Sequence, residues 1–183
     1  YFLTPKIFDI IDNLKPSWRN ELEITDALQI LLSENNKISY HIITDYWKDT
    51  GTPEDIINAN RAILENKTSY FYGEKSDSVS LTGIVLIGKG TKILGDSQIM
   101  GPVIVGENCI LDNVCIGPNC SIGNNSQINN SNIQNSIVMS DCTINTPIKI
   151  RNSIISSNSE IELKNDSQDE KIFLLGEGTK ILL

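Results

Sequence analysis

The sequence predicts a mixed fold: the C-terminal piece of an α/β domain, followed by a left-handed parallel β-helix. Two observations support this prediction. In the first third of the chain, apolar residues follow helical and strand spacings in turn, whereas from residue 78 onward aliphatic residues recur every six positions with small residues between them. A helix repeats about every 3.6 residues and a strand every two, so a sustained period of six indicates coils of three short strands. We place the α/β piece at 1–75 and the β-helix at 76–183.

The first region alternates between strand and helix. In order, we expect the end of a strand at 1–3, a helix from Pro5 that stops before Pro16, a helix that opens at Thr25 or at the preceding acids, a strand over 38–43, and a helix that begins at Thr52 and Pro53. Threonine before proline, followed by two acids, is a typical helix start. Because these few elements cannot bury their apolar faces alone, we expect their packing partners to lie upstream of Tyr1.

The second region has a regular repeat. The aliphatic positions are Leu81, Ile87, Ile93, Ile99, Val105, Ile110, Ile116, Ile122, Ile128, Ile133, Val138, Ile144 and Ile150. Four residues after most of them comes a small or β-branched residue, and between them lie Gly, Asn and Asp, which tolerate the left-handed backbone of a tight corner. Three hexads form one coil, which predicts about four coils between 81 and 150. The Gly-x-Gly-Thr-Lys-Ile-Leu string at 88–94 returns at 176–182, where we expect a last hexad to close the end of the β-helix after an exposed loop at 164–171.

Composition limits the possible partners and compartments. A net charge of −8 argues against nucleic acid and anionic membranes. The apolar runs are too short to span a bilayer, and no signal peptide is visible. All four cysteines, Cys109, Cys115, Cys120 and Cys142, lie in the repeats at spacings that do not match a zinc site. We interpret them as reduced thiols, three of them buried, which favours the cytoplasm; disulfides or a metal remain the alternative.

The repeats resemble those of the hexapeptide-repeat family, many of whose members are acyltransferases with a catalytic histidine on the β-helix. The one histidine of this chain, His41, lies outside the repeats, where a structural role is the simpler interpretation. We therefore disfavour acyl transfer and interpret the β-helix as structural, oligomeric or regulatory.

The first region resembles the sugar-1-phosphate nucleotidylyltransferase family. The resemblance is carried by Tyr1-Phe2, by the string from Lys15 to Asp26 (KPSWRNELEITD) and by the string from Tyr46 to Thr52 (YWKDTGT), in the family's order. Within the family, the chain most resembles glucose-1-phosphate thymidylyltransferases that carry a β-helical tail. The acids of the middle string could equally favour the start of a helix.

This resemblance implies a phosphoryl-transfer enzyme. Sugar phosphate and nucleoside triphosphate are both anionic, so Mg²⁺ and cationic side chains are needed. By resemblance, Asp49 is a catalytic residue and one of two aspartate ligands of Mg²⁺, Arg19 holds the sugar phosphate, and Tyr1 and Glu21 border the sugar site. The alternatives are a turn residue for Asp49, a solvated arginine, and a helix-start acid for Glu21. Asn20 stands where the family usually has glycine, which leaves the local turn geometry open.

The resemblance also says what 1–75 lacks. The family's glycine-rich nucleotide loop and its second metal-binding aspartate have no counterpart in 1–75, so we expect a missing N-terminal nucleotide-binding half and an isolated chain that is inactive. The alternatives are a related adenylyl- or guanylyltransferase and a non-catalytic β-helix that assembles oligomers. We expect a homo-oligomer in either case.

Overall fold

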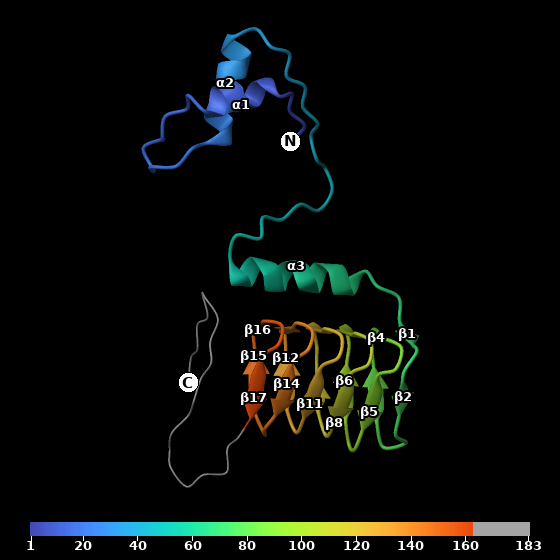
Figure 1. Ribbon diagram of the computed structural model, residues 1–183. Helices are drawn as coiled ribbons and strands as arrows, with labels where there is room; N and C mark the ends of the chain where they lie inside the picture. Colours follow the sequence, from blue (N-terminus) through green and yellow to red (C-terminus); the bar gives the residue numbers. More distant parts are fainter. Residues whose placement is uncertain (163–183) are drawn as a thin grey trace, which may run out of the picture. The chain divides into compact units, whose positions relative to one another are not determined.

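The computed structural model describes residues 1–162. The chain forms two compact units, Tyr1–Trp47 and a second unit that begins at Lys48 (Figure 1). The first unit is helical. The second holds one helix and all the strands.

Two helices build the core of the first unit. They are α1 (Lys6–Ile11) and α2 (Ile24–Ser33), and they pack through Ile7, Ile10, Ala27 and Leu31. The helix predicted from Pro5 is confirmed, with Pro5 itself at the N-cap, and the second helix begins at Ile24. Lys6 Nζ bridges the two helices with an ion pair of 2.6 Å to the Glu34 carboxylate.

Both strands predicted in this unit are absent. Residues 1–3 and 38–43 have no regular secondary structure, and Ile42 and Ile43 are 70% and 60% exposed. A strand needs a neighbour to satisfy its backbone, and the part of the chain described in this unit offers none. The alternation over 38–43 is therefore not accompanied by a strand in the described residues.

The second unit is a parallel β-helix of three sheets, as predicted (Figure 1). The first sheet holds β1 (Tyr70–Phe71), β4 (Val85–Ile87), β7 (Val103–Val105), β10 (Cys120–Ile122), β13 (Ile137–Val138) and β16 (Ile154–Ile155). The second holds β2 (Glu74–Lys75), β5 (Lys92–Leu94), β8 (Ile110–Asp112), β11 (Gln127–Asn129), β14 (Thr143–Asn145) and β17 (Glu160–Glu162). The third holds β3 (Ser80–Thr82), β6 (Gln98–Met100), β9 (Cys115–Ile116), β12 (Asn132–Gln134) and β15 (Lys149–Arg151).

The register of these sheets stacks the repeat residues in columns. In the third sheet, Leu81, Ile99, Ile116, Ile133 and Ile150 pair in succession, which gives the four coils expected over this interval. The sequence pattern assigns one core position of the repeat wrongly. In the second sheet Leu111, not Ile110, pairs with Ile93 and Ile128; Leu111 is fully buried and Ile110 is 38% exposed. The five-residue step therefore follows Leu111 instead of preceding it.

The small residues lie inside the corners of the coils. Thr91, Ser97, Ser126 and three of the cysteines are buried, and their side chains bond to the backbone of neighbouring turns. For example, Thr91 Oγ1 donates to the Gly106 carbonyl at 2.7 Å and accepts from the Cys109 N–H at 3.0 Å. The corner residues are left-handed as predicted: Asn113 and Asn125 have φ of 50° and 58°.

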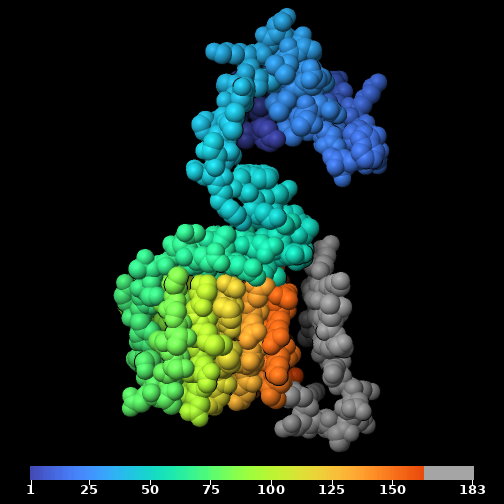
Figure 2. All heavy atoms as spheres, turned by 180° about the vertical axis from the view of Figure 1, so that it is seen from behind, coloured from blue at the N-terminus to red at the C-terminus, as the bar shows by residue number. Residues whose placement is uncertain are grey.

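The helix α3 (Pro53–Glu65) lies along the first sheet (Figures 1 and 2). Its predicted N-terminus is confirmed, because the Thr52 hydroxyl accepts from the Asp55 N–H at 3.2 Å. Ile57 and Leu64 form its buried face, at 6% and 2% exposed. The helix therefore folds with the β-helix and belongs to the second unit.

The β-helix begins earlier in the chain than the repeat pattern predicts. Its first strands, β1 and β2, lie before residue 76, because they already pair with β4 and β5. The exposed loop and the closing hexad expected at 164–182 lie outside the described residues. Within 1–162, no helix has the length and apolar character that crossing a membrane requires.

Candidate active-site residues

The loop before α2 presents Arg19. The loop is closed by two backbone hydrogen bonds, from the Ser17 N–H to the Glu21 carbonyl at 2.8 Å and from the Asn20 N–H to the Ser17 carbonyl at 2.9 Å. Asn20 has φ 61°, in the left-handed region that glycine and asparagine tolerate best. The turn therefore accepts asparagine where the family usually has glycine.

One carboxylate oxygen organises this loop. Glu23 Oε1 accepts from Arg19 Nε at 3.0 Å, from Arg19 Nη2 at 2.6 Å and from the Ser17 hydroxyl at 3.1 Å. These bonds, that of Arg19 foremost, lower the pKa of the Glu23 carboxyl below its ordinary value. They occupy one edge of the guanidinium, and Nη1 has no hydrogen-bond partner among residues 1–162. Because arginine binds anions through two parallel donors, the second edge remains suited to a phosphate.

A shallow open groove of about 430 Å³ lies beside this loop. Its lining includes Ser17, Trp18, Arg19 and Glu23, and the Trp18 side chain is 94% exposed. Glu21 lies near the arginine, with its carboxylate 3.8 Å from Nη2. Tyr1 is 85% exposed and does not line the groove. The structure thus brings together two of the predicted site residues, Arg19 and Glu21, and leaves Tyr1 apart from them.

Asp49 lies in the second unit, just before α3. Its side chain is exposed and runs past Gly51, whose position would put a Cβ 3.8 Å from Asp49 Oδ1. The neighbouring Lys48 forms an ion pair of 2.6 Å with Asp55, and the Thr52 hydroxyl donates to the other oxygen of Asp55 at 2.7 Å. These two partners, Lys48 first, lower the pKa of the Asp55 carboxyl. Asp49 therefore lies between Lys48 and Thr52, whose side chains both bond to Asp55.

The fit of a magnesium ion to these residues is partial. Mg²⁺ prefers hard oxygen donors, and Asp49 supplies one carboxylate that no described side chain engages. Asp55 is committed to Lys48 and Thr52. In the described part of the chain, no three His, Cys, Asp or Glu side chains group as a metal site would need. Asp49 fits the ion as one ligand of a site that further donors must complete.

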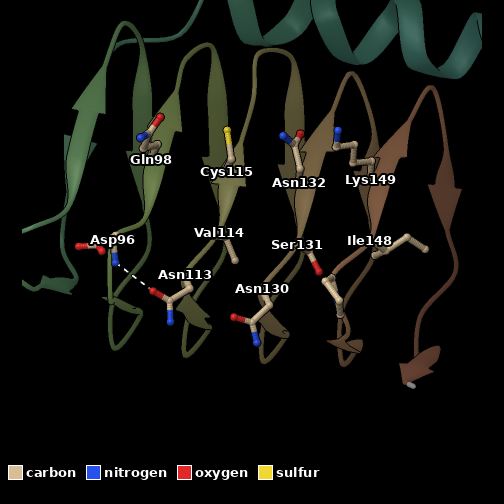
Figure 3. Close-up of a pocket in the computed structure, with 11 residues that line it drawn as sticks. Asp96, Gln98, Asn113, Val114, Cys115, Asn130, Ser131, Asn132, Ile148 and Lys149 are labelled. Atoms are coloured by element: carbon tan, nitrogen blue, oxygen red, sulfur yellow. Dashed lines mark hydrogen bonds between the residues drawn. The ribbon is translucent and has the colours of Figure 1, made fainter. Parts of the chain in front are cut away.

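The β-helix has a groove of its own, of about 480 Å³, on the third sheet (Figure 3). Gln98, Cys115, Asn132 and Lys149 form a row along one side of it, and Asn113 and Asn130 lie at the corners below them. No histidine lines it. Acyl transfer needs a base for the acceptor hydroxyl or amine, and this lining provides no imidazole for that role. The groove therefore gives no support to an acyltransferase.

Sequence reasoning found Arg19 and Asp49 but did not assign Glu23 its role as the partner of the arginine. The available signal was the spacing of four between an arginine and a glutamate, which brings side chains together when the turn between them is tight. From the sequence alone, these acids could either support the sugar site or start the helix.

Comparison with known families gives two separate matches along the chain. A family model described as Nucleotidyl transferase matches residues 1–66, and a model described as GMPPB C-terminal domain matches residues 99–181. The first match contains the Arg19 loop and Asp49. The second covers most of the β-helix.

Individual relatives extend over both regions. A glucose-1-phosphate thymidylyltransferase of Streptomyces antibioticus is 34% identical over 99% of this chain and 51% of its own length. The low-salt glycan biosynthesis nucleotidyltransferase Agl11 of Haloferax volcanii is 35% identical over 100% of this chain and 52% of its own length. The bifunctional protein GlmU of Methanococcus aeolicus is 42% identical over 51% of this chain and 22% of its own length.

The chain thus spans about half the length of the first two relatives. Both relatives are nucleotidyltransferases by name, and both match the helical region and the β-helix in one alignment. The Nucleotidyl transferase match over the Arg19 and Asp49 motifs, the parallel β-helix after them and these two relatives fit a sugar-1-phosphate nucleotidylyltransferase of the form that carries a β-helix.

Proposed function

We propose that the chain is the C-terminal portion of a glucose-1-phosphate thymidylyltransferase, which converts dTTP and glucose 1-phosphate to dTDP-glucose and pyrophosphate. The observation that carries the proposal is the Arg19 side chain, which Glu23 holds by one edge at 3.0 and 2.6 Å. Its Nη1 has no hydrogen-bond partner among residues 1–162, the Glu21 carboxylate lies 3.8 Å from Nη2, and a guanidinium edge suits a phosphate. The name of the Streptomyces relative supports this choice of substrates.

The reaction has a simple balance. An oxygen of the sugar phosphate attacks the α-phosphorus of the triphosphate, and a new phosphorus–oxygen bond forms there. The bond from that phosphorus to the bridging oxygen breaks, and pyrophosphate leaves with its electron pair. Since both reactants are anions, their approach needs cationic groups on the protein.

Each candidate residue has a role in this proposal. Arg19 binds the phosphate of the sugar phosphate and orients its attacking oxygen. Glu21 and Tyr1 border the sugar in the complete site. Asp49 binds Mg²⁺, which when bound offsets the charge of the phosphates. The other metal ligand and the nucleotide loop are proposed to lie in a half of the enzyme upstream of Tyr1; the complete enzyme below means both halves together.

The β-helix carries no part of this chemistry. We propose that it has a structural, oligomeric or regulatory role in a homo-oligomeric enzyme of the cytoplasm. Light scattering tests the assembly: a complete enzyme that is strictly monomeric at micromolar concentration would contradict it. The complete enzyme is expected to need no nucleic acid or membrane.

The test is an assay of pyrophosphate release by the complete enzyme with glucose 1-phosphate and each of dTTP, UTP, ATP and GTP. We expect the highest kcat/KM with dTTP, a requirement for Mg²⁺, and no turnover by residues 1–183 alone. Preference for ATP or GTP would instead indicate the related adenylyl- or guanylyltransferase. Metal-dependent turnover by 1–183 alone would contradict the placing of the nucleotide site upstream.

A further inference from the structure

The helix α3 is attached to the β-helix by polar as well as apolar contacts. The Ser121 hydroxyl, on β10, donates to Asn60 Oδ1 at 2.5 Å, and Arg61 Nη2 donates to Asn135 Oδ1 at 3.0 Å. Asn135 in turn donates to Asn152 of the next coil at 2.6 Å. Together with the buried Ile57 and Leu64, these bonds hold α3 at more than one point along its length.

The same helix anchors the loop that carries Asp49. At its first turn, Thr52 caps the helix and Asp55 binds Lys48 at 2.6 Å. The backbone from Lys48 to Thr52 is thus tied to α3 at both of its ends, with Asp49 in between. Ile56 adds a backbone bond to the Thr52 carbonyl at 3.1 Å.

We propose that the β-helix positions the Asp49 loop through α3, with Ser121 and Asn135 as the positioning residues. The chain of contacts runs from the stacked coils through Asn60 and Arg61 to the first turn of α3, and from there to Lys48. The positioning itself rests on these contacts alone. Only its consequence for metal binding depends on the function proposed for Asp49.

The physical reason for such an arrangement is rigidity. An exposed loop of five residues has few contacts of its own and samples many conformations, whereas a metal ligand must be held in a narrow range of positions. A stack of coils with fully buried columns is a stiff support, and a helix fixed to it passes that stiffness to its first turn. The β-helix then contributes to the site without contacting substrate.

Amide hydrogen exchange of the 1–183 chain tests the positioning. The variants are Ser121→Ala, which removes the donor to Asn60, and Arg61→Met, which removes the guanidinium but keeps a helix-forming side chain. Loss of one such hydrogen bond is expected to raise the local opening equilibrium about five-fold. The amides of Asp55 and Ile56 are protected by their bonds to the Thr52 hydroxyl and carbonyl. We therefore expect the exchange of these two amides to rise by about that factor, and by more in the double variant, while the amides of β7 and β10 keep their protection.

Matched controls lie on the third sheet. Ser80→Ala and Arg151→Met make the same substitutions at exposed positions of β3 and β15, and no side chain–side chain bond of either residue occurs in the described structure. They are expected to leave the exchange of Asp55 and Ile56 unchanged. The proposal is overturned if these controls raise that exchange equally, or if Ser121→Ala and Arg61→Met raise the exchange of later amides of α3 but not that of Asp55 and Ile56.

The complete enzyme separates this proposal from the function of Asp49. If Asp49 binds the metal, Ser121→Ala and Arg61→Met are expected to raise the Mg²⁺ concentration needed for half-maximal rate several-fold, with the KM for glucose 1-phosphate unchanged. Faster exchange at Asp55 and Ile56 together with full activity in Asp49→Asn would retain the positioning and refute the metal role. Unchanged exchange at Asp55 and Ile56 together with inactivity of Asp49→Asn would refute the positioning alone.

Discussion

The neighbours Ile110 and Leu111 offer a direct test of the β-helix register. Leu111 is fully buried between Ile93 and Ile128, whereas Ile110 is 38% exposed on the outer face of the same strand. Leu111→Ala leaves a cavity in a column that the coils above and below cannot fill. Substitutions of this kind cost about 2–5 kcal/mol of unfolding free energy. Ile110→Ala loses only strand preference and partial burial, which is worth about 1 kcal/mol or less.

Calorimetry of the two variants measures the difference. For a domain of this size, a cost of about 3 kcal/mol for Leu111→Ala lowers the Tm of the β-helix transition by about 6–12 °C. Ile110→Ala is expected to lower it by no more than about 4 °C. The two substitutions lie one residue apart in one strand, so the comparison controls for position in the stack. The register would be refuted if Ile110→Ala were the more destabilising variant, as a repeat with Ile110 in the core column would require.

Three further predictions concern the site and the thiols. Arg19→Lys in the complete enzyme is expected to raise the KM for glucose 1-phosphate at least tenfold with little change for the nucleotide, because lysine lacks the second parallel donor; equal effects on both KM values would contradict its role. Since the pKa of the Glu23 carboxyl is lowered, its bond to Arg19 is present above the ordinary carboxyl pKa and is lost as pH falls through the lowered value, which an NMR titration of Glu23 measures; a midpoint at or above the ordinary value would contradict it. A thiol reagent at pH 8 is expected to modify Cys115 in the native chain and to spare Cys120, whose pKa burial raises to about 11, and equal rates would contradict the burial.

Much of the fold could be predicted because the same sequence pattern recurs in every coil of the β-helix. Aliphatic columns, small corner residues and left-handed asparagines each recur many times, so the pattern survives a local irregularity. Its one misplaced step occurs where two aliphatic residues stand side by side at 110–111 and either satisfies a period of five or six. Only the pairing of Leu111 with its neighbours decides between them.

The strands expected at 1–3 and 38–43, by contrast, could not be predicted correctly from the sequence pattern. Alternation of apolar and polar residues records which face a strand buries, but a strand forms only beside another strand. The described part of the first unit provides no such neighbour, and the apolar side chains of 38–43 are therefore exposed. The alternation alone therefore does not make 38–43 a strand in the described residues.

The candidate site was accessible to sequence reasoning only in part. Motif order pointed to Arg19 and Asp49, since each stands in a recognisable string of residues. Neither motif shows how its residue is held. Glu23 accepts three hydrogen bonds on one oxygen because the left-handed Asn20 turns the loop back on itself, and Asp49 is fixed through the docking of α3 on coils more than 60 residues away in sequence. Such contacts depend on the folded backbone.

We propose, as the central claim, that this chain supplies Arg19, which binds the sugar phosphate, and Asp49, one metal ligand of a nucleotidyl-transfer site. Its most direct test is Mg²⁺-dependent pyrophosphate release from dTTP and glucose 1-phosphate by the complete enzyme, compared with its Asp49→Asn variant at equal folding by calorimetry. We expect the variant to fold normally and to lose activity by at least a hundredfold. Undiminished turnover of Asp49→Asn at the same Mg²⁺ concentration would contradict the claim.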